Sequence, residues 1–324
     1  MYSSYTTVIA AALIFAGASP AIAQQVVSDA QCDCYLSDGR FPTYFKNHGF
    51  WDFRSLGQYA KVPPVIQTLD GNKKADFTSP VFNWDSDFAK FWGPQHWAKN
   101  EDTTFPMVNS FNNLYIEKNN NGDSDTFMTM RTSRLPAFQT AAEFESQSPL
   151  DHASIRMLAK THGSSGACTS VFTYKGANQP KDVQECDIEM LTRDDAHYIH
   201  YTNQPGVLNG DVVPGASRNV TLPNGLRWSD WVKHRLDWTP GRTTWSANGA
   251  EVASQTFQAP RDPSIVLLNA WSDGGEWTDK MPEGGEAYQN VQWIEILYNV
   301  ADKASCNKVC SVDKSPVVGK PVLL

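Results

Sequence analysis

The feature that most constrains this fold is a series of short strand patterns separated by turn residues, with no amphipathic helix among them. Strand patterns of this kind occur at residues 113–117, 126–132, 153–159, 168–174, 197–202 and 232–238. Asn248-Gly249, between two further runs, is a strong signal for a hairpin turn. Many short strands at this spacing predict an all-β fold, a sandwich of two antiparallel sheets.

One expected strand, Val183 to Leu191, carries an acid at every second position. The acids are Glu185, Asp187 and Glu189, and the residues between them are apolar. Because successive side chains of a strand point to opposite faces, all three acids share one face. Like charges this close raise one another's pKa, so the arrangement costs stability unless it has a use.

Two interpretations of these acids are open from the pattern alone. In an ideal strand Glu185 and Glu189 lie about 13 Å apart. A curved strand with inward-leaning side chains would bring their carboxyls to about 5–6 Å. A retaining glycosidase needs a separation of about 5–5.5 Å. The other interpretation is a solvated strand face, because a chain with 35 acids in 324 residues forms such a triplet readily by chance.

The residues after these acids resemble glycoside hydrolase family 16. The motif Glu-x-Asp-x-Glu at Glu185 is followed, in order, by HYIHYTN at 197–203, VKHRLDW at 232–238, WSANG at 245–249, LNAWS at 268–272 and VQWIEI at 291–296. The resemblance covers residues 76–299. It is nearest to lichenases, xyloglucan transferases and fungal transglycosylases, because the extra residue that laminarinases insert before the last Glu is missing. Cys186 departs from the family, where Ile, Leu or Val is usual.

The resemblance implies a concanavalin A-like jelly-roll sandwich with the acids on the floor of an open cleft. It implies that Glu185 is the nucleophile, Glu189 the general acid and then the general base, and Asp187 a hydrogen-bonding partner of Glu185. The implied activity is retaining, endo-acting cleavage of a cell-wall β-glucan-type polysaccharide, with no metal and no organic cofactor. Transglycosylation by the same residues is one alternative. A non-catalytic glycan-binding sandwich is another, and the intact acid triad argues against it.

The aromatic residues are candidates for substrate binding, since flat rings stack on the apolar faces of sugars. There are 11 Trp and 11 Tyr, most of which must lie in the core. By resemblance, Trp271 faces the sugar and Tyr201 lines the cleft. His197 shares the parity of Tyr201, and Trp92 and Trp97 lie in a segment expected to form a loop at the cleft. A core position is the alternative for these rings.

Six cysteines, an even number, indicate an oxidising compartment. Four of them lie near the termini and are expected to form two disulfides that join the ends of the chain: Cys32, Cys34, Cys306 and Cys310. Cys168 and Cys186 lie in consecutive expected strands, so we expect a third, cross-strand bridge behind the acids. The alternative is that these thiols are unpaired and buried. No Cys-x-x-Cys pair with matching His spacing indicates a metal site.

The N-terminal residues 1–23 are uncharged and contain an apolar run and a small-residue cleavage pattern, Ala21-Ile22-Ala23. They are interpreted as a secretory signal peptide. No other stretch is long and apolar enough to span a membrane. We expect residues 24–75 to form an N-terminal extension packed on a sandwich at 76–310, with a tail at 311–324.

The net charge of −8 argues against nucleic acid or an anionic membrane as partner, whereas a neutral polysaccharide is compatible with it. Asn219, in Asn219-Val-Thr221, is the only glycosylation sequon and is expected at the surface. Together these features predict a secreted monomer, located outside the cell or in the cell wall, that acts on a polysaccharide.

Overall fold

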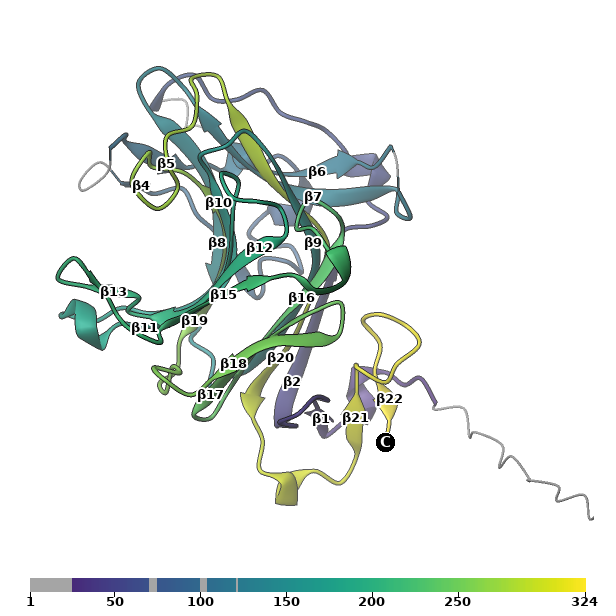
Figure 1. Cartoon of the computed structure of the whole chain (residues 1–324). Helices are drawn as coiled ribbons and strands as arrows, with labels where there is room; N and C mark the ends of the chain where they lie inside the picture. Colours follow the sequence, from purple (N-terminus) through teal and green to yellow (C-terminus); the bar gives the residue numbers. More distant parts are fainter. Residues whose placement is uncertain (1–24, 70–74, 100–103, 121) are drawn as a thin grey trace, which may run out of the picture.

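The computed structural model describes residues 25–69, 75–99, 104–120 and 122–324. These residues form two twisted sheets packed on each other, which confirms the predicted sandwich (Figure 1). The predicted signal peptide, residues 1–23, lies outside the described residues. No helix in the described part of the chain is long and apolar enough to cross a membrane.

The first sheet carries the strand with the three acids and is called the acid sheet. Its strands are β3 (Trp92–Pro94), β8 (Gln139–Ser146), β10 (Cys168–Lys175), β11 (Gln184–Leu191), β12 (Tyr198–Gln204), β15 (Ser217–Thr221) and β19 (Ile265–Trp271). Their order across the sheet is β15–β12–β11–β10–β19–β8–β3, and every neighbouring pair is antiparallel. The acid strand β11 therefore lies near the middle of the sheet.

The second sheet packs against the acid sheet. Its long strands are β2 (Tyr44–Asp52), β6 (Leu114–Lys118), β7 (Thr126–Arg134), β9 (Ala153–Gly163), β16 (Val232–Thr239), β17 (Arg242–Ala247), β18 (Ala250–Gln255) and β20 (Glu286–Val300). β20 pairs with β9 on one edge and with β7 and then β2 on the other. β8 joins the sheets, because its first residues pair with β7 and its later residues with β19.

The other elements are short. The remaining strands are β1 (Cys34–Leu36), β4 (Ala98–Lys99), β5 (Met107–Asn109), β13 (Val207–Leu208), β14 (Asp211–Val212), β21 (Val309–Ser311) and β22 (Val322–Leu323). The 3-10 turns are η1 (Asp29–Gln31), η2 (Gly57–Tyr59), η3 (Pro80–Phe82), η4 (Phe111–Asn113), η5 (Pro180–Asp182), η6 (Pro223–Gly225) and η7 (Lys303–Ser305). Asn248 and Gly249, both with positive φ, form the predicted turn between β17 and β18.

The core between the sheets fixes which face of β11 carries the acids. Cys186, Ile188 and Met190 are buried there, in one cluster with residues of the second sheet such as Met157 and Ile294. A slip of one residue would move these three side chains out and the three acids in. The alternation in the sequence therefore determines the acid-bearing face.

Two disulfides join the ends of the chain, as predicted. Cys32 bonds to Cys310, and Cys34 bonds to Cys306. β1 runs parallel to β21, so the N-terminal and C-terminal segments lie side by side (Figure 1). The segments expected as an extension and a tail thus both contribute strands, and β2 pairs directly with β20 in the second sheet.

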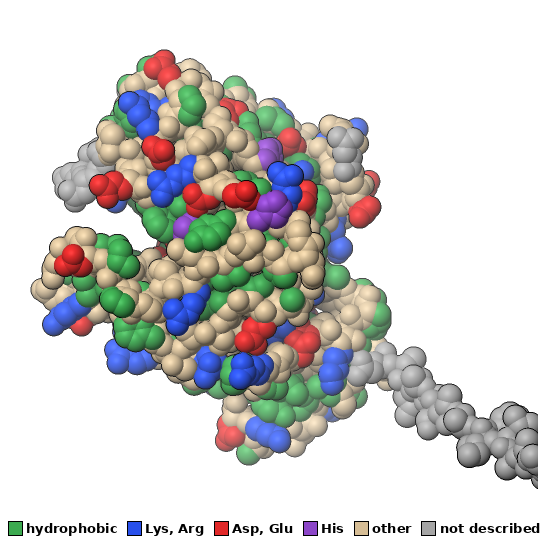
Figure 2. All heavy atoms as spheres, viewed as in Figure 1, with side chains coloured by type: hydrophobic (Ala, Val, Ile, Leu, Met, Phe, Trp, Pro, Cys, Tyr) green, Lys and Arg blue, Asp and Glu red, His purple; other side chains and the backbone are tan. Residues whose placement is uncertain are grey.

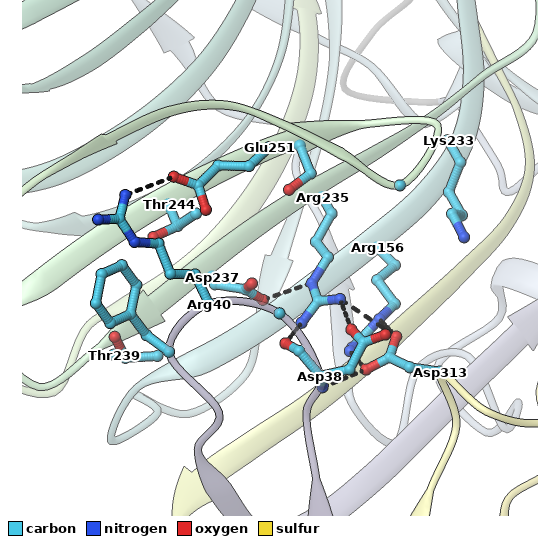
Figure 3. A pocket seen from close by; sticks show the side chains of 14 residues that line it. Asp38, Arg40, Arg156, Lys233, Arg235, Asp237, Thr239, Thr244, Glu251 and Asp313 are labelled. Carbon is cyan, nitrogen blue, oxygen red and sulfur yellow. Dashed lines mark hydrogen bonds and ion pairs between the residues drawn. The ribbon is translucent and has the colours of Figure 1, made fainter.

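A charged pocket on the second sheet fastens both terminal segments to it (Figure 3). Arg156 donates to Asp313 at 2.7 Å, and Arg235 donates to Asp38 at 2.6 Å and to Asp237 at 2.8 Å. Burial would raise the pKa of Asp313, but the charges of Arg156 and Arg235 hold it well below its usual range. The acids of β11 do not line this pocket. Its ion pairs connect the terminal segments, through Asp38 and Asp313, to the second sheet.

The third predicted disulfide, between Cys168 and Cys186, is wrong. Both thiols are free and buried. In the pairing of β10 with β11, Cys168 lies opposite Leu191, whereas Cys186 lies opposite Thr173. Cys168 shares the face of the acids, with its Sγ 3.5 Å from Glu189 Oε1, while Cys186 faces the core. Two thiols on opposite faces and at different positions along the strands cannot be bridged.

Candidate active site

The three acids of β11 lie together on the face of the acid sheet that points away from the core. Asp187 is 1% exposed, and Glu185 and Glu189 are half-buried. The amide of Gln204, from β12, donates a hydrogen bond of 2.9 Å to Asp187 Oδ2. The predicted common face of the acids is thereby confirmed.

Burial raises the pKa of all three carboxyls. For Glu185, burial and then the charge of Glu189 raise the pKa to about 8, while a hydrogen bond with Asp187 acts in the opposite direction. For Asp187, burial comes first, and the charges of Glu185 and Glu189 add to it. Burial therefore favours the protonated form of Asp187, the form that can donate a hydrogen bond to Glu185.

The protonation states of the two glutamates are linked. Carboxyls that interact this strongly titrate as a group, because one charge opposes the next. Since the charge of Glu189 contributes to the raised pKa of Glu185, a proton on Glu189 favours an ionised Glu185. The pair can thus hold one charged and one neutral carboxyl, the division that acid–base chemistry at neutral pH requires.

The surroundings of Glu189 oppose the effect of burial on its pKa. The indole Nε1–H of Trp277 donates to Glu189 Oε1 at 2.9 Å, and the Cys168 thiol lies 3.5 Å from the same oxygen. Burial raises the pKa of Glu189, whereas Trp277, Cys168 and the charge of His200 lower it. Glu189 is therefore suited to losing and regaining a proton.

Polar side chains lie opposite Glu189 on the neighbouring strands and form a row across the acid sheet, the polar row. In order across the strands its members are Asn219, His200, Glu189, Ser170, Asn269 and Glu143. Hydrogen bonds connect His200 with Asn219 at 3.1 Å, Ser170 with Asn269 at 2.5 Å and Asn269 with Glu143 at 3.4 Å. A linear molecule that follows this row crosses the strands and passes Glu189.

The surface is hollowed between two lobes, one with β4 and β5 and the other with β13 and β14 (Figure 2). In Figure 1, strands β8, β10 and β12 of the acid sheet lie to the right of these two lobes. At the start of β12 there is a further hollow of about 470 Å³, lined by Asp194, Asp195, His197, Tyr198 and Thr221. Among the described residues, no three His, Cys, Asp or Glu side chains are arranged to hold a metal ion.

Of the predicted binding residues, Trp271 lies at the acid-bearing face. It is half-buried and lies opposite Cys168 at the end of β19, on the same face as the acids. His197 precedes β12, is half-buried, contacts Asp195 at 2.7 Å and lines the hollow at the start of that strand. Asn219 of the sequon is exposed on β15, as expected, and its side chain contacts His200.

The other two predicted binding residues, Tyr201 and Trp92, are buried in the core, which corrects both predictions. Tyr201 is 0% exposed and lies opposite Ile188, so it points away from the acids and stacks on Trp245. Trp92 is also 0% exposed and packs against rings that include Phe144. The expected loop around Trp92 forms strand β3, whose pairing with β8 turns this ring inward.

Several residues at the site were not singled out from the sequence. They are Glu143, Ser170, His200, Gln204 and Asn269. A signal existed for three of them. Glu143 precedes Phe144-Glu145 in the same alternation as the acid strand, and His200 and Gln204 alternate with the buried Ile199 and Tyr201.

The chain is similar in sequence to known glycosyl hydrolases. Residues 86–295 match the model of the family described as glycosyl hydrolases family 16. A β-glucanase of Paenibacillus macerans is 24% identical over 163 residues, which are 49% of this chain and 65% of that protein. For a β-glucanase of Bacillus licheniformis the identity is 25% over 133 residues, 40% of this chain and 51% of that protein. The chain therefore matches less than two thirds of the length of these relatives.

Solved structures share the fold at low identity. A Bacillus licheniformis β-glucanase superposes with a TM-score of 0.53 at 21% identity, covering 67% of this chain and 96% of that one. An endo-β-1,3-glucanase of Pyrococcus furiosus superposes with a TM-score of 0.55 at 14% identity, covering 83% and 99%. Identities this low support the shared sandwich architecture only.

Proposed function

The chain belongs to glycosyl hydrolases family 16, and from this premise we propose that it cleaves a β-glucan polysaccharide within the chain, with retention of the anomeric configuration. The observation that carries the proposal is the set of three linked carboxyls on one open face of β11. Retaining glycosidases use two such groups, one as nucleophile and one as acid and base. All atoms that the reaction needs come from carboxyls, substrate and water.

In the first step the ionised Glu185 attacks the anomeric carbon and forms a bond to it. The glycosidic C–O bond breaks at the same time, and the leaving oxygen takes the proton of Glu189. Asp187 supports Glu185, because its hydrogen bond lowers the pKa of that group and so favours the charged form. The products of this step are a glycosyl ester on Glu185, a released chain end and a charged Glu189.

In the second step the charged Glu189 takes a proton from water, whose oxygen attacks the same carbon. The ester bond to Glu185 breaks, and both glutamates return to their starting states. Two displacements at one carbon restore its configuration. The donors on Glu189, Trp277 and Cys168, stabilise the charge that it carries between the steps.

The substrate we propose is a neutral β-glucan that lies along the polar row. Its hydroxyls would find donors and acceptors on Ser170, Asn269 and Glu143, and the ring of Trp271 offers a stacking face nearby. The net charge of −8 disfavours a polyanionic substrate. The two terminal disulfides support a location outside the cell.

The proposal is tested by replacing each glutamate in turn. Glu185→Ala should lose several orders of magnitude in activity on β-glucan and regain turnover with azide, giving a glycosyl azide of inverted configuration. Glu189→Ala should still cleave substrates with an activated aryl leaving group, because these need little protonation. Lys233→Ala, on the second sheet, is a matched control and should behave as wild type. Near-normal turnover by Glu185→Ala would contradict the proposal, and so would products longer than the substrate, which indicate transfer to sugar in place of water.

A further inference from the structure

Three of the 11 tryptophans are exposed, and two of them flank the polar row. Trp277, 38% exposed, bonds to Glu189, and Trp97, 43% exposed, forms a hydrogen bond that lowers the pKa of Glu143. The third, Trp84, is 58% exposed, the most of the three, and contacts neither acid. A single exposed ring is common on protein surfaces, so the case for a ligand at Trp84 depends on the rings and polar groups around it.

Trp84 is held at the surface by its neighbours. The backbone N–H of Ser86 donates to the carbonyl of Asn83 at 2.9 Å, which closes a turn with Trp84 at its tip. The rings of Phe77 and Phe111 stack on each other with centroids 4.3 Å apart. Trp84 lies beside both, at 5.1 and 5.9 Å, with its plane almost perpendicular to theirs. This cluster of Trp84, Phe77 and Phe111 is called the aromatic platform.

The aromatic platform continues the line of the polar row. At the end of the row, the backbone N–H of Gln95 donates to the carbonyl of Glu143 at 2.8 Å. The next residue, His96, places its ring 4.9 Å from Phe111 of the platform. From Glu189 to Glu143 the row crosses three strand spacings, about 14 Å. Contacts thus connect the end of the row with the platform, from Glu143 through Gln95 and His96 to Phe111, which lies beside Trp84.

The rim of the platform carries the polar groups that sugar recognition needs. Asn83 is half-buried and Asp85 is exposed on either side of Trp84. Within the described parts of the chain, neither side chain has a hydrogen-bond partner. An apolar ring face between free amide and carboxylate groups matches a sugar ring, whose C–H face is apolar and whose edge carries hydroxyls.

We propose that the aromatic platform around Trp84 is a distal binding site for a sugar residue of the same β-glucan chain that occupies the active site. This inference rests on the proposed function and adds that substrate length matters. The protein acts best on glucan chains long enough to extend from Glu189 along the polar row to Trp84. Short substrates bind at the three acids only, so contacts with the platform add nothing to their binding.

The test compares Trp84→Ala with Trp84→Tyr on two substrates. One is the β-glucan that wild type cleaves, and the other is an activated aryl disaccharide of the same linkage, too short to reach the platform. Loss of one aromatic stacking contact should raise KM for the polymer about tenfold in Trp84→Ala. Trp84→Tyr keeps a ring and should lie close to wild type. The aryl disaccharide should be cleaved equally by all three proteins. Phe41→Ala, in the loop between β1 and β2, is the control for losing an exposed ring.

Two outcomes overturn the inference while leaving the proposed function intact. They are an unchanged KM for the polymer in Trp84→Ala and an equal loss on both substrates in a folded variant. If the unchanged KM comes with a change from dimer to monomer, a second copy of the chain covers the ring. A wild type that is inactive on every β-glucan and on the aryl substrate refutes the proposed function itself.

Discussion

The hydrogen bond from Trp277 to Glu189 leads to a defined prediction for the pH profile. Trp277→Phe keeps an aromatic ring in place and removes the indole N–H that donates to Glu189 at 2.9 Å. Because that bond stabilises the charged carboxylate, its loss should raise the pKa of Glu189 further. Glu189 must be protonated for the first step, so the alkaline limb of kcat/KM should move to higher pH.

The expected size of this shift follows from the hydrogen bond. A hydrogen bond to a charged group contributes about 1.5–3 kcal/mol, and one pKa unit corresponds to about 1.4 kcal/mol. Trp277 is 38% exposed, so water replaces part of the lost bond and the lower end of the range applies. We therefore expect an upward shift of about one pKa unit.

The assay is kcat/KM on β-glucan from pH 4 to 10, which reports ionisations of the free enzyme. Trp271→Phe is the matched control, because this ring lies on the same face without a hydrogen bond to Glu189; its KM should change while the limb stays in place. With an activated aryl leaving group, the alkaline limb should largely disappear in all variants. A limb that stays or moves downward in Trp277→Phe would refute the assignment of Glu189 as the acid.

Three further predictions concern stability and binding. Burial would lower the pKa of His48, but hydrogen bonds to Asp29 and Glu295 raise it from 6.5 to about 9. This contribution to stability is present below pH 6.5 and is lost as the pH rises through 9. Urea unfolding should show a loss of about 3 kcal/mol over this window that is absent in His48→Gln. Thiol titration of the unfolded, unreduced protein should find two thiols, and Cys32→Ser should find three and lower the free energy of unfolding by about 2–5 kcal/mol. Trp271→Ala should raise KM for β-glucan with the melting temperature unchanged; an unfolded variant would instead mean that this ring is part of the core.

The sequence predicted the features that depend on local periodicity. Alternation along β11 was enough to place Glu185, Asp187 and Glu189 on one face, because the pleat leaves no other arrangement. The turn at Asn248-Gly249 followed from the backbone conformation that these two residues favour. The two disulfides between the terminal segments could be predicted because four cysteines lie near the ends of the chain.

The errors arose where register between strands decides the outcome. Cys168 and Cys186 lie in consecutive strands, but nothing in either strand alone shows that they face opposite sides of the sheet. Tyr201 was assigned to the cleft by resemblance, although its own strand alternates buried Ile199 and Tyr201 with polar His200. Trp92 was expected in a loop, and only its pairing with β8 reveals that the ring points into the core.

The polar row could be found only in part from the sequence. Glu143-Phe144-Glu145 has the alternation of the acid strand and could have been recognised. Ser170 and Asn269 lie in strands that are mostly apolar or mixed, so no period distinguishes them. Their role at the site depends on which residues of the neighbouring strands lie in register with Glu189, which is a property of the folded sheet.

The central claim, that Glu185 and Glu189 act in two successive displacements, is tested most directly by the configuration of the first product. Proton NMR of β-glucan cleavage, recorded before mutarotation, distinguishes the α and β anomers at the new reducing end. Two displacements predict that the β anomer forms first and then equilibrates. An α anomer formed first would require a single displacement by water, and would contradict the role of Glu185 as nucleophile.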